Sequence, residues 1–460
     1  MTAKSPSALT CPRVLGARTA RSMRRALDFL RERSTPELLT LVGRTFPELA
    51  LHGPRADKRA FPVSYGGGKP CDDDLLAGLG MFYVTEAGRL MLDCTSGHYQ
   101  MTWGYNHPEL TAALVKAERL GIVWDNHSNI PSVPVKLLAD RLVAQAGPGF
   151  DRVLLGVCTG SVACAAALKI MLMRYLRDPA RAGLGPPVIV ALAGNYHGTD
   201  MAAQTLRGMW PGLVTGMECV QVEPNDRDGL RGAFARYGAR VAGFWAEPVM
   251  MNREALLVDP EFLQLARKLC TEHGALFAVD EIQTCFWYPE VFLSRRLGVQ
   301  PDFLVVGKGM TAGFHPLAAL IYRAELDVLE QYDAISTNGN ASLAAFVGLC
   351  NLELIRRNAD LLERLARKHC DGLVALAGEF PAVLERVNGV GFLSGLRFRQ
   401  REDALGFHTA ALHEGLWLRA HAYHPGHRTV LMKLPLAVED AVLGYVHDGL
   451  RRLLRTTPWR

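Results

Sequence analysis

The sequence lacks several features that would assign it to common classes of protein. Its ten cysteines are scattered along 460 residues, with no Cys-x-x-C and no paired spacing. This pattern argues against a disulfide framework or a cysteine zinc site and is typical of reduced thiols in a cytoplasmic protein. No apolar stretch reaches the ~18 residues needed to cross a membrane. We therefore expect a cytoplasmic protein with no membrane contact and no metal site.

Excess charge is also scarce, because a formal net charge of +5 is small for this length. Outside the N-terminus, Lys and Arg do not cluster with aromatic residues, so we expect no nucleic-acid partner. The first 27 residues contain several arginines and no acidic residue. Transit peptides share that composition, but we favour a basic arm that leads into a helix over Arg21–Arg31. A second helix is predicted over Pro36–Leu51.

From about residue 150 onward, short apolar runs alternate with helical stretches. Seven runs have the length and apolar content of buried strands. They are Val153–Val157, Pro187–Leu192, Cys219–Val222, Val241–Ala246, Ala275–Val279, Phe303–Val306 and Leu317–Tyr322. Helical patterns lie between most of them, for example Ser161–Leu176 and Pro260–His273. This alternation predicts an α/β fold with a mostly parallel, seven-stranded, doubly wound sheet, and the last two runs include the one antiparallel strand.

The length of the chain predicts more than one domain. We expect an N-terminal arm with helices over residues 1–92 and a large domain over residues 93–344. A smaller C-terminal α/β domain is expected over residues 345–460, where helices and strands alternate.

Two of the predicted strands end in a polar residue suited to cofactor chemistry. Asp280 ends one apolar run, and Lys308 follows another between two glycines. Open α/β sheets bind ligands at the carboxyl ends of their strands. A lysine can form a Schiff base with pyridoxal phosphate, and an aspartate can keep its pyridine nitrogen protonated. An ordinary Lys–Asp ion pair is the alternative interpretation of these two residues.

Further polar residues follow other predicted strands. Gly160 and Ser161 open a long helix, where backbone N–H groups and a hydroxyl favour an anion such as phosphate, although a simple helix cap would also explain the serine. Tyr196 lies after the next strand, and its ring suits stacking on a pyridine. Gln283 offers an amide close to Asp280 that could donate to the phenolic oxygen of the ring.

These motifs resemble those of class III aminotransferases, a family of fold-type-I enzymes that depend on pyridoxal 5'-phosphate. The resemblance runs from about Asp93 to about Leu436. Its most specific part is Asp280-Glu281-Ile282-Gln283-Thr284, followed by Pro301-Asp302 and Gly307-Lys308-Gly309. Supporting matches are Thr159-Gly160-Ser161, Tyr196-His197-Gly198, Glu247-Pro248 and Thr337-Asn338-Gly339.

The resemblance implies that Lys308 carries the cofactor and moves protons, while Asp280 pairs with the pyridinium. It implies that Tyr196 stacks on the ring and that Gly160 and Ser161 hold the phosphate. Thr337 would reach the phosphate from a second subunit, so the resemblance also implies a homodimer with active sites at the interface. His197, Glu247 and Gln283 complete the expected cofactor-binding set.

The chain departs from the family pattern where the substrate carboxylate is usually bound. Leu431 occupies the position of the family arginine that precedes Pro-Leu. The glutamate that pairs with this arginine in the family is also absent, because Glu247-Pro248-Val249 continues as Met250-Met251-Asn252. Loss of only one partner would leave a buried charge unpaired. The joint loss therefore indicates a remodelled carboxylate site.

We expect the substrate to contact His98, Tyr99, Trp287 and Arg428. Arg419 and Lys433 are alternatives to Arg428 for binding a carboxylate, and Trp103 and Trp124 could also line the cleft. The histidine-rich run His421–His427 is expected to be a surface loop.

The sequence predicts a PLP-dependent enzyme that acts on an amino acid or amine. The first hypothesis is an aminotransferase with an atypical substrate. The second is an enzyme that uses the Cα carbanion for elimination, replacement, epimerisation or carbon–carbon bond formation in a specialised biosynthetic pathway. S-adenosylmethionine, which has a good leaving group, is one substrate considered for it. A non-catalytic binding protein is disfavoured because the expected cofactor residues are present.

Overall fold

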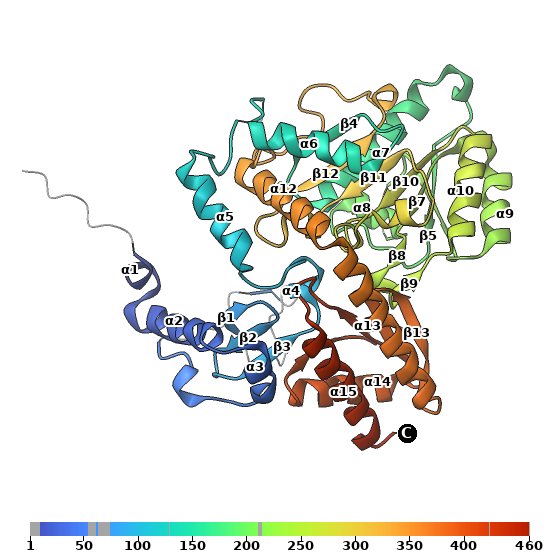
Figure 1. Ribbon diagram of the computed structural model, residues 1–460. Coiled ribbons are helices and arrows are strands. Elements are labelled where there is room, and N and C mark those ends of the chain that lie inside the picture. The colour runs from blue at the N-terminus through green and yellow to red at the C-terminus, as the bar shows by residue number, and fades with distance from the viewer. Residues whose placement is uncertain are drawn as a thin grey trace, which may run out of the picture.

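Seven apolar segments form a central sheet in the computed structural model of the protein (Figure 1). The structure describes residues 10–53, 61–62, 74–127, 129–209, 214–422 and 424–459. The strands of the sheet are β4 (Arg152–Val157), β5 (Val188–Leu192), β6 (Glu218–Val222), β7 (Val241–Ala246), β10 (Leu276–Asp280), β11 (Phe303–Val306) and β12 (Ala318–Tyr322). The predicted strands agree with these bounds to within one residue at each end.

The strand order is β4-β12-β11-β10-β7-β5-β6. Strand β12 runs antiparallel to both of its neighbours, and the other pairings in this sheet are parallel. The prediction of a mostly parallel sheet with one antiparallel strand among the last two runs is confirmed. Hydrogen bonding to a strand on either side satisfies the backbone of the apolar central strands.

Helices cover both faces of this sheet because its strands are apolar on both sides. Along β5, Ile189 and Ala191 pack into the core under α7 (Gly160–Arg177), whereas Val188, Val190 and Leu192 face the other core. This alternation follows from the two-residue period of a strand. The remaining helices of this region are α4 (Ser96–Tyr99), α5 (Pro108–Arg119), α6 (Val133–Ala146), α8 (Met201–Leu206), α9 (Arg227–Tyr237), α10 (Pro260–Glu272), α11 (Leu293–Arg296) and α12 (Ser342–Arg357).

The C-terminal region forms a smaller α/β unit. Its sheet has the order β13-β14-β17-β16. Its strands are β13 (Leu384–Val390), β14 (Leu393–Phe398), β16 (Arg419–His421) and β17 (Thr429–Lys433), and its helices are α13 (Ala359–Glu379), α14 (Arg401–His413) and α15 (Asp440–Thr456). A two-stranded sheet, β8 (Val249–Met250) with β9 (Leu256–Leu257), lies between β7 and α10 in the sequence.

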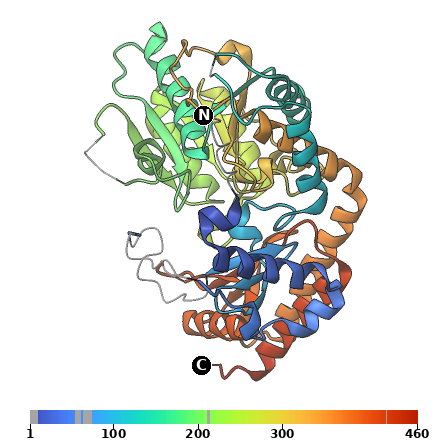
Figure 2. The ribbon, with the colours of Figure 1, turned by 90° about the vertical axis from the view of Figure 1, so that its left-hand side faces the viewer.

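A sheet that the sequence did not predict joins a segment before the central sheet to a segment of the C-terminal unit. Strands β1 (Leu75–Leu79), β2 (Phe82–Thr85) and β3 (Leu90–Asp93) are antiparallel neighbours, and β3 pairs in parallel with β15 (Leu416–Trp417). Figure 2 shows the blue N-terminal helices beside the orange and red C-terminal elements. The division of the chain at residues 92 and 344 stays a prediction.

The N-terminal helices differ in part from their predicted bounds. Helices α1 (Cys11–Leu15) and α2 (Ala17–Arg31) include the helix expected over Arg21–Arg31. The helix predicted over Pro36–Leu51 is wrong in its second half, because α3 (Thr35–Leu41) ends before Gly43, whose φ of 84° is left-handed. No helix in the described part of the chain is long and apolar enough to cross a membrane.

Candidate active site

Two polar residues lie at the carboxyl ends of neighbouring parallel strands. Asp280 is the last residue of β10, and Lys308 begins the short helix η6 (Lys308–Thr311) just after β11. The backbone of Lys308 has a φ of 37°, in a region that residues with a Cβ rarely adopt. Such strain persists only where the surrounding structure fixes it, and it is common at functional positions.

A cavity of about 320 Å³ opens beside Lys308. The lining residues come from the end of α4, from the start of α7 and the loop before it, from η6, and from the loop between η6 and β12. They are Gln100, Cys158, Thr159, Gly160, Lys308, Thr311, Gly313, His315, Pro316 and Leu317. Thr159 caps α7 by accepting a hydrogen bond from the N–H of Val162. The cavity therefore joins Lys308 to the positive end of a long helix, which is suited to an anion.

Two glycines allow the loops around this cavity to approach closely. A Cβ on Gly160 would overlap the side chain of Ile282, which lies next to the end of β10. A Cβ on Gly198 would overlap the hydroxyl of Ser161, and Gly198 has a φ of 134°. The helix terminus, the Asp280 strand end and the segment after β5 thus meet at one place.

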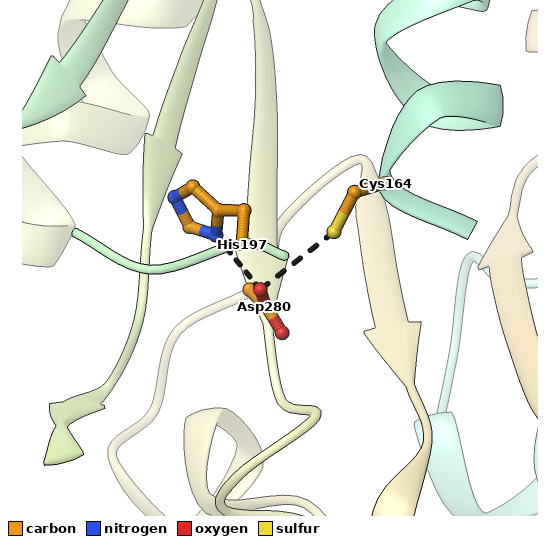
Figure 3. Close-up of side chains that lie close together, drawn as sticks. All are labelled: Cys164, His197 and Asp280. Atoms are coloured by element: carbon orange, nitrogen blue, oxygen red, sulfur yellow. Dashed lines mark hydrogen bonds and ion pairs between the residues drawn. The ribbon is translucent and has the colours of Figure 1, made fainter. Parts of the chain in front are cut away.

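Asp280 is held by a buried network, which Figure 3 shows. Its carboxylate lies 2.7 Å from Nδ1 of His197 and accepts hydrogen bonds from the N–H of Ile282 at 2.8 Å and from the thiol of Cys164 at 3.7 Å. The His197 ring also packs against Trp245, with centroids 5.2 Å apart. These contacts fix the orientation of the carboxylate at the edge of the sheet.

The ligand atoms of Cys164, His197 and Asp280 lie within 4.8 Å of one another, a spacing that could hold a metal ion. Their protonation favours a hydrogen-bonded network instead. Burial, followed by the charge of Asp280, raises the pKa of the Cys164 thiol well above its usual value. Metal binding requires a thiolate, and the hydrogen bond to Asp280 already occupies Nδ1 of His197.

Glu247 and Gln283 extend this network on the side of Tyr196. One carboxylate oxygen of Glu247 accepts a hydrogen bond from the N–H of Tyr196 at 2.8 Å, and the other accepts one from Gln283 at 3.5 Å. Gln283 also donates to the side-chain oxygen of Asn252 at 3.1 Å. Tyr196 is half-buried, and the guanidinium of Arg207 lies 5.9 Å from its ring centre.

Burial sets the ionisation of the groups in the site. Burial lowers the pKa of Lys308, although Asp280 and Glu247 act in the opposite direction. Burial raises the pKa of Glu247 to about 7. Burial lowers the pKa of His197, but its hydrogen bond to Asp280 and the charges of Asp280 and Glu247 outweigh that effect, so its pKa lies above the usual value.

The residues expected near the substrate fall into three groups. His98 and Tyr99 belong to a turn in which Ser96, Gly97, His98 and Tyr99 all have positive φ, between 53° and 72°. Asp93 holds this turn by accepting hydrogen bonds from Thr95 and from the N–H of Gly97. Tyr99 is buried and His98 is exposed.

Trp287 and Lys433 form the second group, and both are buried. The Nζ atom of Lys433 lies 4.3 Å from the Trp287 ring centre and 5.4 Å from that of Tyr99. It donates hydrogen bonds to the carbonyl oxygens of Gln283 at 2.6 Å and Tyr99 at 3.3 Å. Burial lowers the pKa of Lys433 well below its usual value, and the charge of Lys308 acts in the same direction.

Arg428 lies in an ion-pair cluster. It donates to Glu385 at 2.8 Å, and its backbone N–H donates to Glu254 at 2.6 Å. By contrast, Arg419 on β16 contacts His98, His421 and Tyr99. The structure therefore brings Arg419, rather than Arg428, beside His98 and Tyr99.

Other expected residues lie outside these groups. Trp103 is buried and donates to Asn351, whereas Trp124 is exposed and donates to Glu118. Thr337 is exposed. The surface loop predicted over His421–His427 is wrong at its first residue, because His421 is buried on β16.

Sequence reasoning missed Cys164, Asn252 and Arg207 as parts of the site. Cys164 lies on the inner face of α7, one helical turn after Gly160, so its spacing from the helix start could have indicated it. Asn252 stands at the position of the family glutamate, but only the fold reveals its contact with Gln283. Arg207 carries no local signal for its position beside the Tyr196 ring.

The residues around Lys308 fit pyridoxal 5'-phosphate. The cavity offers a helix terminus for a phosphate and an amine of lowered pKa for a carbonyl carbon. The buried carboxylate of Asp280, at the end of the neighbouring strand β10, suits a protonated ring nitrogen. The Nε2 atom of His197 is buried and makes no hydrogen bond within the described residues.

The family model described as aminotransferase class-III matches residues 74–454. Curated relatives include glutamate-1-semialdehyde 2,1-aminomutase from Rhodopirellula baltica, which is 31% identical over 62% of this chain and 65% of its own length. Acetylornithine aminotransferase 2 from Bordetella pertussis is 31% identical over 75% of this chain and 85% of that protein.

Solved structures agree on the fold. Ornithine aminotransferase from Toxoplasma gondii is similar with a TM-score of 0.76 and 22% identity, over 86% of this chain and 93% of that one. The family match extends beyond the range of about 93–436 over which the motifs resembled the family. The chain therefore belongs to the class III aminotransferase family, whose members are fold-type-I enzymes that depend on pyridoxal 5'-phosphate.

Proposed function

We propose that the protein is an aminotransferase that acts on a small amino substrate atypical for its family. The observation that carries this proposal is the cavity that Lys308 shares with Thr159 and Gly160, next to the end of β10. When bound, the cofactor supplies an electron sink for the bond changes at the substrate carbon. The protein then has to hold the cofactor, orient the substrate and move protons.

Lys308 is the proposed attachment point and proton carrier. Its lowered pKa leaves a larger fraction of the amine neutral near pH 7, and a neutral amine is both a nucleophile and a base. The left-handed backbone and the flanking Gly307 and Gly309 hold this side chain at the carboxyl end of β11. The same Nζ atom would attach to the cofactor and, when free, could accept a proton from the substrate.

The other cofactor contacts are proposals that the geometry supports. Asp280 would pair with the ring nitrogen, since His197 and the N–H of Ile282 already orient its carboxylate. Gly160 and Ser161 would bind the phosphate at the start of α7.

Tyr196 would stack on the ring, and Glu247 would fix the backbone of Tyr196 through its hydrogen bond to that N–H. Gln283 would donate to the phenolic oxygen of the ring. The side chains of Glu247 and Asn252 accept hydrogen bonds from the Gln283 amide, so both could hold this amide in place.

Leu431 supports the alternative in which the carbanion is used for elimination, replacement or carbon–carbon bond formation. It is fully buried where the family usually has a carboxylate-binding arginine. A substrate whose carboxylate is bound at another position could place a different bond of its Cα atom perpendicular to the cofactor ring. S-adenosylmethionine remains a test compound for this alternative.

We also propose a homodimer with active sites at the interface. Exposed apolar side chains gather on the loop between α5 and α6, where Leu120 is 81% and Trp124 is 72% exposed. Asn338 donates to Asp125 in this loop at 2.8 Å, so the exposed Thr337 adjoins the same surface. A second copy of the chain would cover the apolar side chains and bring Thr337 to the phosphate of its partner.

Light scattering tests the dimer. Trp124→Glu should reduce the mass to that of a monomer and weaken cofactor binding, whereas Leu176→Glu, which alters a side chain equally exposed at the end of α7, should do neither. A monomeric wild-type enzyme with full activity would contradict this proposal.

We infer a cytoplasmic location from the thiols. All cysteines among the described residues are free, and five of them are at least partly exposed to solvent: Cys11, Cys158, Cys219, Cys350 and Cys370. Free thiols are typical of a reducing compartment.

Absorbance spectroscopy of the holoenzyme with single amino compounds tests the function. An aminotransferase should lose the visible band of the Lys308-bound cofactor and release a stoichiometric keto acid. Retention of that band with formation of some other product would favour the alternative chemistry. A Lys308→Ala variant with full activity would exclude both enzyme proposals.

A further inference from the structure

Arg419 lies directly across from the position where the family usually has its carboxylate-binding arginine. Strands β16 and β17 are antiparallel, and Arg419 is the cross-strand partner of Leu431. Cross-strand partners have Cβ atoms about 5 Å apart. A guanidinium is therefore present at the same level of the small sheet, but on the neighbouring strand.

The partners of Arg419 leave its positive charge unmatched. Its Nη1 atom lies 2.9 Å from Nδ1 of His98, and its Nε donates to Nε2 of His421 at 3.2 Å. The guanidinium carbon is 5.8 Å from the Tyr99 ring centre. Among the described residues, no carboxylate forms an ion pair with Arg419. Arginine binds a carboxylate through two parallel N–H groups, and this geometry is lost when the partners are single ring nitrogens.

Neighbouring arginines of the small domain differ in this respect. Arg428 pairs with Glu385 at 2.8 Å, and Arg397 pairs with Glu254 at 3.3 Å. Their charges are already balanced by carboxylates. Of these three guanidinium groups, Arg419 is the one that could gain a charged partner from a ligand.

Arg419 and Lys308 are linked through the segment that carries Tyr99 and Gln100. Gln100 lines the cavity beside Lys308, and the ring centre of its neighbour Tyr99 lies 5.8 Å from the guanidinium carbon of Arg419. Tyr99 contacts both Arg419 and Lys433, and Lys433 in turn lies over Trp287. A ligand between Lys308 and Arg419 would therefore lie beside Tyr99.

We propose that Arg419 binds the carboxylate of the substrate and takes over the role of the missing family arginine. The inference rests on the proposed amino substrate and narrows it to amino acids, to the exclusion of amines that lack a carboxylate. On binding, the carboxylate replaces His98 as the partner of the guanidinium.

The site should favour a carboxylate in every half-reaction. In a site where a glutamate of the protein can pair with the substrate-binding arginine, the arginine charge is neutralised when the substrate has no carboxylate. Such a site accepts both kinds of substrate. Asn252 stands where the family has that glutamate, and it accepts a hydrogen bond from Gln283. Because no carboxylate among the described residues pairs with Arg419, its charge would repel a second ammonium group, so a diamine should bind poorly.

Carboxylates without an amino group test this inference independently of catalysis. Butanoate and hexanoate are titrated into the holoenzyme at constant ionic strength, and binding is followed by the absorbance of the cofactor. A charged hydrogen bond accounts for roughly 10- to 100-fold in affinity, so Arg419→Gln should raise the dissociation constant by about that factor. Arg419→Lys should give an intermediate value, because it keeps the charge without the paired N–H groups.

The controls separate a local effect from a loss of structure. Arg399→Gln removes an exposed arginine of the same domain that donates to Pro381, and it should leave carboxylate affinity unchanged. Circular dichroism should show that the variants are folded. If Arg419→Gln keeps wild-type affinity while Arg428→Gln or Lys433→Met loses it, the assignment to Arg419 is overturned.

The proposed function and this inference can fail separately. Carboxylate binding that depends on Arg419, without amino transfer from any amino acid, would contradict the aminotransferase proposal and support the inference. Amino transfer whose KM and kcat are both unaffected by Arg419→Gln would support the aminotransferase proposal and contradict the inference about Arg419.

Discussion

The ammonium nitrogen of Lys433 lies 4.3 Å from the centre of the Trp287 ring, in a position fully shielded from solvent. The same nitrogen donates to the carbonyl oxygens of Gln283 and Tyr99. One side chain of the small domain thus joins the segment after β10 to the turn that carries His98. An ammonium group is costly to bury, and aromatic and carbonyl partners reduce that cost.

Replacement of Lys433 by methionine should change how stability depends on pH. The pKa of Lys433 is lower in the folded protein than its value of about 10.4 in the unfolded chain. Unfolding therefore takes up a proton between these two values, and stability rises with pH over that interval. Lys433→Met should reduce this rise by up to ~1.4 kcal/mol per pH unit.

Urea denaturation of the apoprotein from pH 7 to pH 10 measures this effect. Lys308 has a lowered pKa as well, so some slope should remain in the variant. An identical slope in wild type and variant would show that Lys433 titrates as an exposed lysine. The two carbonyl groups left without a donor should also cost about 1–3 kcal/mol each.

Glu247→Gln should change stability in the opposite sense and at lower pH. Burial raises the folded-state pKa of Glu247 to about 7, whereas the unfolded value is near 4.3. Unfolding releases a proton between these values, so wild-type stability falls as pH rises through that interval. The variant has no such proton and should show a flatter profile between pH 5 and pH 7. Denaturation midpoints that fall equally in both proteins would contradict the assignment.

Gly198→Ala should weaken the binding of pyridoxal phosphate more than that of pyridoxal. An added Cβ would overlap the Ser161 hydroxyl, and the φ of 134° is unfavourable for alanine. We expect at least a tenfold increase in the dissociation constant of the phosphorylated cofactor. Fluorescence titration of the apoprotein with both compounds measures the difference. Gly444→Ala on α15, where a Cβ meets open space, is the matched control. Equal losses for both compounds would indicate a general distortion.

His197→Phe should weaken cofactor binding through Asp280. The variant keeps a ring against Trp245 but removes the group 2.7 Å from the carboxylate. A charge-assisted hydrogen bond contributes ~1.5–3 kcal/mol, which corresponds to about 10- to 100-fold in affinity. Asn at this position can still donate and should restore part of the loss. Unchanged affinity in both variants would mean that Asp280 keeps its position without this histidine.

The sequence was sufficient to predict the central sheet because its strands are continuous apolar runs. The runs of β10 and β11 end at an aspartate and before a glycine, so their bounds, and with them Asp280 and Lys308, could be located to within one residue. The antiparallel β12 was also recognisable, because too few residues separate it from β11 for a helical crossover.

Features that depend on distant pairing could not be predicted. Strand β15 has only two residues, and its partner β3 lies more than 300 residues earlier in the chain. The position of Arg419 opposite Leu431 depends on the register of β16, which no local pattern determines. Lys433 was considered for the substrate site, but lysine is rarely buried, and only the structure reveals its aromatic and carbonyl partners.

The left-handed turn from Ser96 to Tyr99 has a consequence for the order in which the protein matures during translation. The Ser96 hydroxyl donates a hydrogen bond to the carbonyl oxygen of Lys433, and the N–H of Lys433 donates to the carbonyl oxygen of Cys94. Residues made early are thus held by a strand that is made 337 residues later. A nascent chain that ends after the central sheet therefore lacks the β17 contacts that hold this turn.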